Sequence, residues 1–275
     1  MDRTHLHEVL PPYRESMARG DWEGALRLLE EKGGAQGERL APAEAMDLAA
    51  IHGLQGRTDA AAALLARLAE SRDARLAAEA VLRLASLYVS DDSRREEAAR
   101  LLDRVVSLGG DDPKIRGMTA HLRSRLMWKA GNVGEAGRLL EQARTLLGKA
   151  GAEEELAKVL DSCAMLHDHR GEPREAVTCY TLSLAKKALH RDLVGIGITL
   201  GNLGRFHLRG GAPAIALPLF EEDLRIAESL SDRTASVTLK IMPVLALAFV
   251  RTRTTVLLCN LAELPSTSSA TWSQS

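Results

Sequence analysis

Two pairs of residues with metal-binding chemistry are the first candidates for a functional site. His7 and Glu8 begin like the zinc-binding HExxH motif, but Pro11 stands where the second histidine is required. His167 and His169 lie two residues apart in a segment with helical periodicity. Residues two apart on a helix point about 200° apart, so this pair cannot share one ion. The sequence therefore predicts no metal site.

A glycine-rich stretch and three cysteines are the remaining candidates for catalysis. Residues 195–201 read GIGITLG, which departs from the dinucleotide-binding GxGxxG pattern at Leu200 and follows no predicted strand. Cys163, Cys179 and Cys259 form no CxxC pair and have no plausible base, and isolated cysteines are usually small core residues. We therefore predict no catalytic residue and no cofactor, and we interpret the chain as a non-enzyme.

The composition favours a soluble all-α protein. Of 275 residues, 45% are hydrophobic, 27% are charged and only 3% are aromatic, which suits close-packed helices better than a β-sandwich. A net charge of −1 gives no general attraction for nucleic acid or an anionic membrane. The N-terminus lacks a signal-peptide core, and residues 241–250, the longest apolar run, are too few to span a bilayer. We predict a cytoplasmic location.

One alanine recurs along the chain and reveals an internal repeat. It lies in the pattern G-x-x-x-x-A-x-x-[LCY]-[LFY], and successive copies are 36, 37, 38, 40 and 40 residues apart. The six copies, which we take as structural anchors, are Ala25, Ala61, Ala98, Ala136, Ala176 and Ala216.

Two further positions keep step with this anchor. Twelve residues before it the side chain is small in five of six units, as at Gly204. Four residues after it the side chain is always large and apolar, as at Phe220. A small residue facing a large one lets two helices cross closely. Each unit therefore reads as a first helix, which we call helix A, then a turn, and then a second helix, helix B.

The predicted turns carry residues that end one helix and start the next. Five units have glycine where helix A stops, which suits a left-handed C-terminal cap. Pro173 and Pro213 suit the first turn of helix B. The third unit lacks the glycine, and there Ser93 is the predicted N-cap of helix B.

This pattern resembles the tetratricopeptide repeat (TPR). Leu203-Gly204 and Ala216-x-x-x-Phe220 match its motif, whereas His207 occupies the tyrosine position and the proline of helix B is absent. The 36–40-residue period is similar to the long-period, kinesin-light-chain-like subtype of bacterial regulatory proteins. The resemblance implies an all-α, right-handed α-solenoid of about six helix-turn-helix repeats that serves as a non-catalytic scaffold or adaptor for protein–protein interaction.

The expected domain boundaries follow from where the pattern holds. The resemblance is good over residues 40–232 and weak over residues 8–32, where Pro11-Pro12 shortens the first helix. The predicted segments are a degenerate N-terminal capping repeat and loop (1–41), the repeat array (42–232), an atypical C-terminal helix or lid (233–265) and a disordered tail (266–275). A truncated array or a shifted reading frame would also explain the break after residue 232.

The resemblance also implies where a partner binds. In stacked TPR hairpins helix A lines the concave side, with inward-facing positions 15, 11, 8 and 7 residues before each anchor. The predicted groove residues are Arg83, His121, Arg125, Trp128, Lys129, Met165, Arg205 and Arg209. Arginine suits carboxylates and an aromatic side chain suits an apolar anchor, so we expect a protein or peptide partner, with an acidic segment as the favoured type. The alternative is that these side chains form only a solvated face.

Helix A of the sixth unit is unusually rich in glycine. Gly195, Gly197 and Gly201 each cost roughly 0.5–1 kcal/mol relative to alanine in a helix interior. Close packing against the fifth unit is the explanation that we favour, and a soft hinge that adapts to a ligand is the alternative.

Three other functions are alternatives to a free-standing scaffold. The first is a truncated sensor or docking region of a larger kinase or transcriptional regulator, because fold does not fix function. The second is a helical-repeat enzyme, which the lack of paired carboxylates or of a nucleophile with its base opposes. The third is a nucleic-acid binder, which the near-neutral charge opposes.

Overall fold

Twelve α-helices and one short 3-10 helix make up the described part of the chain. The computed structural model describes residues 11–18, 21–34 and 37–229, so the predicted C-terminal lid and tail (233–275) lie outside the described residues. The first six helices are α1 (Pro12–Ala18), α2 (Trp22–Gly33), α3 (Pro42–Leu54), α4 (Thr58–Leu68), α5 (Ala74–Val89) and α6 (Arg95–Gly109). The other six are α7 (Pro113–Lys129), α8 (Val133–Lys149), α9 (Glu153–His169), α10 (Pro173–Leu189), α11 (Leu193–Arg209) and α12 (Pro213–Ser229).

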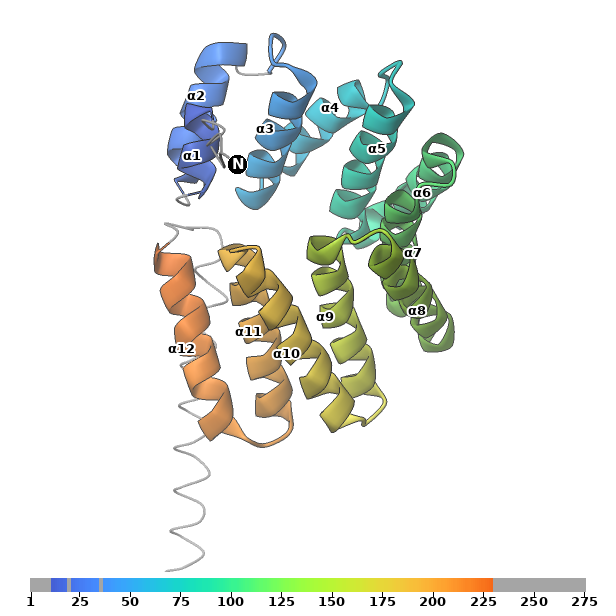
Figure 1. Ribbon diagram of the computed structural model, residues 1–275, viewed down its shortest axis with the longest axis vertical. Coiled ribbons are helices and arrows are strands. Elements are labelled where there is room, and N and C mark those ends of the chain that lie inside the picture. The colour runs from blue at the N-terminus through green and yellow to red at the C-terminus, as the bar shows by residue number, and fades with distance from the viewer. Residues whose placement is uncertain (1–10, 19–20, 35–36, 230–275) are drawn as a thin grey trace, which may run out of the picture.

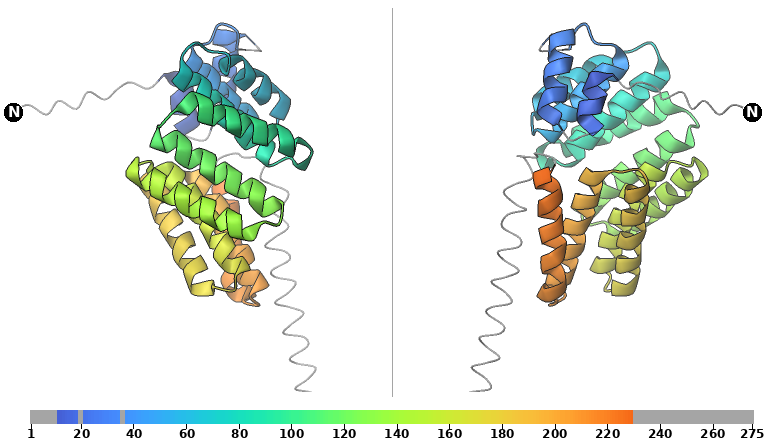
Figure 2. Two further views of the ribbon diagram at one scale, coloured as in Figure 1. Left: turned by 90° about the vertical axis from the view of Figure 1, so that its right-hand side faces the viewer. Right: turned by 60° about the vertical axis from the view of Figure 1, so that its left-hand side comes forward.

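These helices alternate as helix A and helix B of six hairpins. Each odd-numbered helix packs against the even-numbered helix that follows it, and each hairpin then packs against the next. Figure 1 shows the hairpins following a curve from α1 at the top, through α7 and α8 at the right, to α12 at the lower left. The views in Figure 2 show successive hairpins side by side along this curve. The predicted all-α solenoid of about six repeats is confirmed, and the ranges above contain no strand.

Each hairpin closes around the repeated alanine. All six anchor alanines are at most 1% exposed, which leaves room for the two helices to approach. In the sixth hairpin, a Cβ added to Gly204 would lie 2.6 Å from Cε1 of Phe220. The absence of a side chain at residue 204 is therefore what lets α11 and α12 cross at this distance.

The turns inside the hairpins agree with the predicted helix signals in most units. Pro173 and Pro213 occupy the first positions of α10 and α12, where a missing N–H costs nothing. Left-handed glycines, with φ between 73° and 80°, end the A helices at Gly56, Gly131, Gly171 and Gly211.

The third unit is where the turn prediction is wrong. Ser93 does not cap helix B, because it lies inside the 3-10 helix η1 (Asp92–Arg94), which precedes α6. Asp91 caps η1 instead, and its carboxylate accepts a hydrogen bond of 2.9 Å from the backbone N–H of Ser93, whereas α6 itself begins after Arg94 without a side-chain cap. A carboxylate accepts this bond better than a hydroxyl, since it also complements the positive end of the helix.

The apolar core differs between the two ends of the array. One continuous cluster of buried Leu, Ile, Val and Ala side chains runs from Tyr13 in α1 to Leu126 in α7. From α9 onward the apolar clusters are small, and one consists of only Leu200 and Ile226 with their partly buried neighbours. Buried polar side chains lie among these small clusters, at Asp161, Ser183, Lys187, Thr199 and Asp223.

Candidate functional site

Successive A helices contact each other along the array. Among the described residues, contacts join α5 with α7 and, to a smaller extent, α9 with α11 and α3 with α5, whereas no two B helices share a comparable contact. This arrangement is expected when the A helices lie on the inner side of a bend. We call the eight predicted groove residues, all of which lie on A helices, the A-helix face.

Two cations of the A-helix face connect α7 to the turn after α5. Arg125 donates through Nη2 to Ser90 Oγ at 3.1 Å. Lys129 donates through Nζ to the backbone oxygen of Ser90 at 3.0 Å and forms an ion pair with Asp92, also at 3.0 Å. The charge of Lys129 is thus matched by a carboxylate, whereas the part of the chain that the structure describes gives Arg125 only a hydroxyl partner. Burial lowers the pKa of Arg125 from its usual value, because burial disfavours the charged form.

Two aromatic side chains of α7 face α9. Trp128 meets the His169 ring edge to face, with centroids 5.0 Å apart. His121 Nε2 lies 2.8 Å from Ser162 Oγ. Burial, followed by the charges of Arg125 and Lys158, lowers the pKa of His121 to about 3, so this imidazole is neutral at physiological pH.

The remaining cations of the A-helix face differ in their partners. Arg83 forms an ion pair of 2.8 Å with Glu79 one turn earlier in α5. Arg209 of α11 pairs with Asp168 of α9 and so links the fifth and sixth units. Arg205 donates to the side-chain oxygen of Asn202, which is a neutral partner.

The A-helix face therefore retains two positive charges that carboxylates do not pair. Of its five cations, Arg83, Lys129 and Arg209 form ion pairs with acids, whereas the described residues offer Arg125 and Arg205 only neutral hydrogen-bond partners. Met165, on α9 between these two arginines in sequence, is 44% exposed. Among the described residues, the predicted cations thus divide into three that pair with acids and two that do not.

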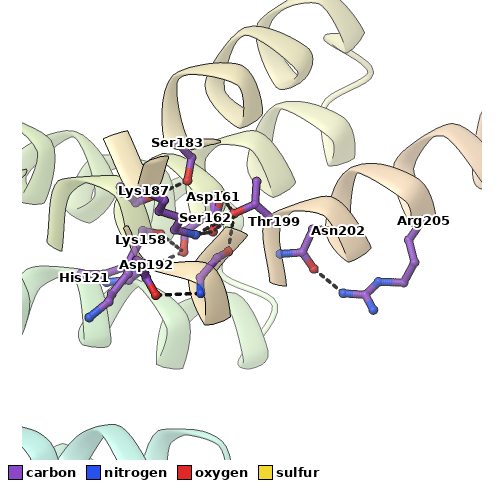
Figure 3. Close-up of polar contacts among 12 residues, drawn as sticks. His121, Lys158, Asp161, Ser162, Ser183, Lys187, Asp192, Thr199, Asn202 and Arg205 are labelled. Atoms are coloured by element: carbon purple, nitrogen blue, oxygen red, sulfur yellow. Dashed lines mark hydrogen bonds and ion pairs between the residues drawn. The ribbon is translucent and has the colours of Figure 1, made fainter. Parts of the chain in front are cut away.

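A buried ion pair that the sequence analysis did not assign lies next to this face. Lys187 Nζ of α10 lies 2.5 Å from Asp161 Oδ2 of α9 and 2.6 Å from Thr199 Oγ1 of α11. Thr199 Oγ1 also donates to Asp161 at 3.0 Å. These three side chains join three helices of two units (Figure 3). The available signal was a lysine in step with Leu147 and Ala227, the apolar residues that the neighbouring fourth and sixth units have at this position.

We expected the glycines of α11 to pack against the fifth unit. Two of them, Gly197 and Gly201, instead pack against α12 in their own hairpin. A Cβ on Gly197 or on Gly201 would lie 2.7 Å from a carboxylate oxygen of Asp223. Gly195 instead follows the helix cap, where a Cβ would meet the side chain of Asp192. The sequence analysis did not identify Asp223, a carboxylate on the apolar face of α12, as the residue that faces these glycines.

The other candidates for chemistry have structural partners. His167 Nδ1 lies 2.6 Å from a carboxylate oxygen of Glu172, while His169 packs on Trp128. Burial raises the pKa of the Cys163 thiol to about 12, which makes it a poor nucleophile at neutral pH. No group of three or more His, Cys, Asp or Glu in the described ranges could hold a metal ion. Over the same ranges, no helix combines the length and apolar character that crossing a bilayer requires.

Comparisons with known proteins identify the fold. No protein-family model matches the chain, and no curated protein matches it. A STAND protein (signal-transduction ATPase with numerous domains) with a tetratricopeptide repeat sensor from Pyrococcus horikoshii is 16% identical, with a TM-score of 0.54. That match covers 82% of this chain and 34% of the other, so the chain spans about a third of the STAND protein's length.

Two further solved structures are similar over most of their own length. BtubC from P. vanneervenii is 17% identical with a TM-score of 0.49, and the match covers 81% of this chain and 99% of that one. MamA is 16% identical with a TM-score of 0.39, over 70% of this chain and 95% of that one. The match to the STAND protein carries the assignment: the fold is that of a TPR-like helical repeat protein.

Proposed function

We propose that the chain is a non-catalytic scaffold that binds a peptide or domain of another protein on the A-helix face. The observation that carries the proposal is that Arg125 and Arg205 lie on this face with neutral partners only among the described residues, while its other cations are paired with acids. A helical repeat array gains little from two unpaired guanidinium groups, whereas a ligand carboxylate would pair with either one in a bidentate geometry.

The apolar part of the same face supports an acidic segment that also carries an apolar residue. Met165, the apolar residue of this face on α9, is 44% exposed, and Ile198, which lies two helical turns before Arg205 on α11, is 56% exposed. Exposed apolar side chains beside arginine are a common setting for the anchors of an interface. Neutral His121 adds no charge, so the two arginines determine the charge preference of the site.

We also propose the finer assignments that the sequence suggested. The array would belong to the long-period, kinesin-light-chain-like subtype and act in a bacterial-type signalling or regulatory system in the cytoplasm. Residues 1–41 would cap an array that extends over residues 42–232, residues 233–265 would form the atypical C-terminal element, and residues 266–275 would form the tail.

A sensor region of a larger regulator is the second candidate function. The similarity to a STAND protein whose TPR part is a sensor favours it, since this chain spans about a third of that protein. In this case the A-helix face would receive a signal that another domain of the regulator transmits.

Reversing the two unpaired charges tests the proposal. Arg125→Glu with Arg205→Glu should abolish crosslinked capture of the partner from the native cell and leave the helical content and melting temperature unchanged. The matched control is Arg138→Glu with Arg225→Glu, which makes the same charge change on the B helices α8 and α12 and should keep the partner. Capture by the first variant at the level of the control would contradict the proposal.

A further inference from the structure

Asp223 is a buried carboxylate to which the described residues offer neither a hydrogen bond nor an ion pair. It lies on the face of α12 that packs against α11 and is only 8% exposed. Its two oxygens rest over Gly197 and Gly201, because a Cβ at either glycine would come within 2.7 Å of one oxygen. Its oxygens are not fully sealed from solvent, but burial of most of the residue still disfavours the charged form, so its place in the hairpin needs an explanation.

The fifth unit shows how the same position is satisfied one repeat earlier. Forty residues before Gly201 and Asp223 stand Asp161 and Ser183, so the carboxylate belongs to helix A in the fifth unit and to helix B in the sixth. Asp161 receives hydrogen bonds from Lys187 and Thr199. At the position of Lys187 the sixth unit has Ala227, so α12 supplies no cation to Asp223.

Arg205 is the cation that can reach Asp223. It follows Gly201 by four residues and therefore lies on the same face of α11, one turn further along. Its guanidinium is held by Asn202, and Figure 3 shows the Arg205 side chain reaching back along α11 to this residue. The side chain of an arginine is long enough to leave Asn202 and contact a carboxylate one turn away.

We propose that Asp223 is a positioning residue for Arg205. The guanidinium has two alternative acceptors: the Asn202 amide, where it stays available on the A-helix face, and the Asp223 carboxylate, where it is withdrawn from that face. The inference rests on the proposed function, because Arg205 is one of the two unpaired arginines of the ligand site. It assigns Asp223 as the residue that controls how strongly this arginine binds an acidic ligand.

The electrostatics of the pair give the direction of its pH dependence. Burial raises the pKa of Asp223 to about 7, and the charge of Arg205 acts against this rise. No other charged group among the described residues shifts it, and α11 is the one helix with extensive contacts to α12. Below this pKa the neutral acid leaves Arg205 on Asn202. As the pH rises and Asp223 ionises, the carboxylate attracts Arg205, so the affinity for an acidic ligand falls.

An experiment without ligand tests the exchange itself. The NMR signals of Arg205 Nε and Asp223 Cγ are followed from about pH 5 to about pH 8 in the full chain. We expect both signals to move with one common midpoint, and Asp223→Asn to leave the Arg205 signal constant. Glu222→Gln, an exposed neighbour on α12 that pairs with Arg225, is the matched control and should titrate like the unchanged protein. An Arg205 signal that stays constant, or titrates equally in Asp223→Asn, would overturn the proposal.

A ligand experiment then separates this inference from the proposed function. The probe is a fluorescein-labelled oligoglutamate peptide. Its affinity should fall about tenfold from low to high pH in the unchanged protein, because the peptide loses its charge-assisted contact with Arg205. In Asp223→Asn the affinity should stay nearly constant over the same range. Equal pH dependence in both proteins would overturn the role of Asp223. Coupled NMR titration without peptide binding at any pH would support the exchange and count against the acidic ligand of the proposed function.

Discussion

The two ends of the array are held together by different forces. From α1 to α7, a continuous apolar core joins one unit to the next. From α9 to α12 the apolar clusters shrink, and a buried ion pair with its hydroxyl partner connects the units. Apolar packing is tolerant of small shifts, whereas a buried charge pair requires one geometry. The comparison indicates that the C-terminal units, which carry Arg205 and Arg209, are fixed in register by specific polar contacts.

Breaking the buried ion pair should have the largest effect. Lys187→Ala leaves the Asp161 carboxylate buried without its cation, and we expect a loss of about 3–5 kcal/mol in the free energy of unfolding. Thermal and urea unfolding monitored by circular dichroism measure this loss. Replacing both charges, with Asp161→Asn and Lys187→Met, should recover most of it, because no buried charge remains. A single Lys187→Ala variant as stable as the unchanged protein would remove the contrast between the two ends.

Removing an apolar contact at the N-terminal end should have the next largest effect. Leu48 of α3 is fully buried in the continuous core, so Leu48→Ala should cost about 3 kcal/mol. Leu189→Ala at an 83% exposed position is the matched control and should change the stability very little. The same unfolding experiments measure both variants. Equal effects of the two substitutions would show that the apolar core does not join the first units.

The exposed link between the fifth and sixth units should have the smallest effect. The Arg209 side chain in its pair with Asp168 is 60% exposed, so solvent screens the attraction. Arg209→Ala should therefore cost less than about 1 kcal/mol in unfolding free energy. If its cost approached that of Lys187→Ala, the surface pair rather than the buried one would join these units.

Much of the fold could be predicted from the sequence, because a repeat imposes the same requirement six times. The spacing of Ala176 and Ala216, and the match of Gly204 with Phe220, predicted hairpins that the structure contains. The sequence did not predict the cap of η1 at Asp91, since residues 90–93 are all serine or aspartate and each of them could cap a helix in this turn.

The candidate site could be predicted only as a set of positions. The repeat period placed the cations on A helices, but which of them are paired depends on side chains about 40 residues away, as with Arg209 and Asp168. Lys187 and Asp223 were missed for a related reason. Each is a charged residue at a position where the adjacent units have an apolar or small one, and pattern matching treats such a residue as an exception rather than as a contact.

Native-state hydrogen exchange of Lys187→Ala tests the central contrast most directly. If the two ends are held by different forces, the backbone amides of α9 to α12 should exchange faster in this variant than in the unchanged protein, while those of α3 to α5 keep their protection. A uniform loss of protection across all the described helices would contradict the account, because it would show one cooperative core in which the buried ion pair has no local role.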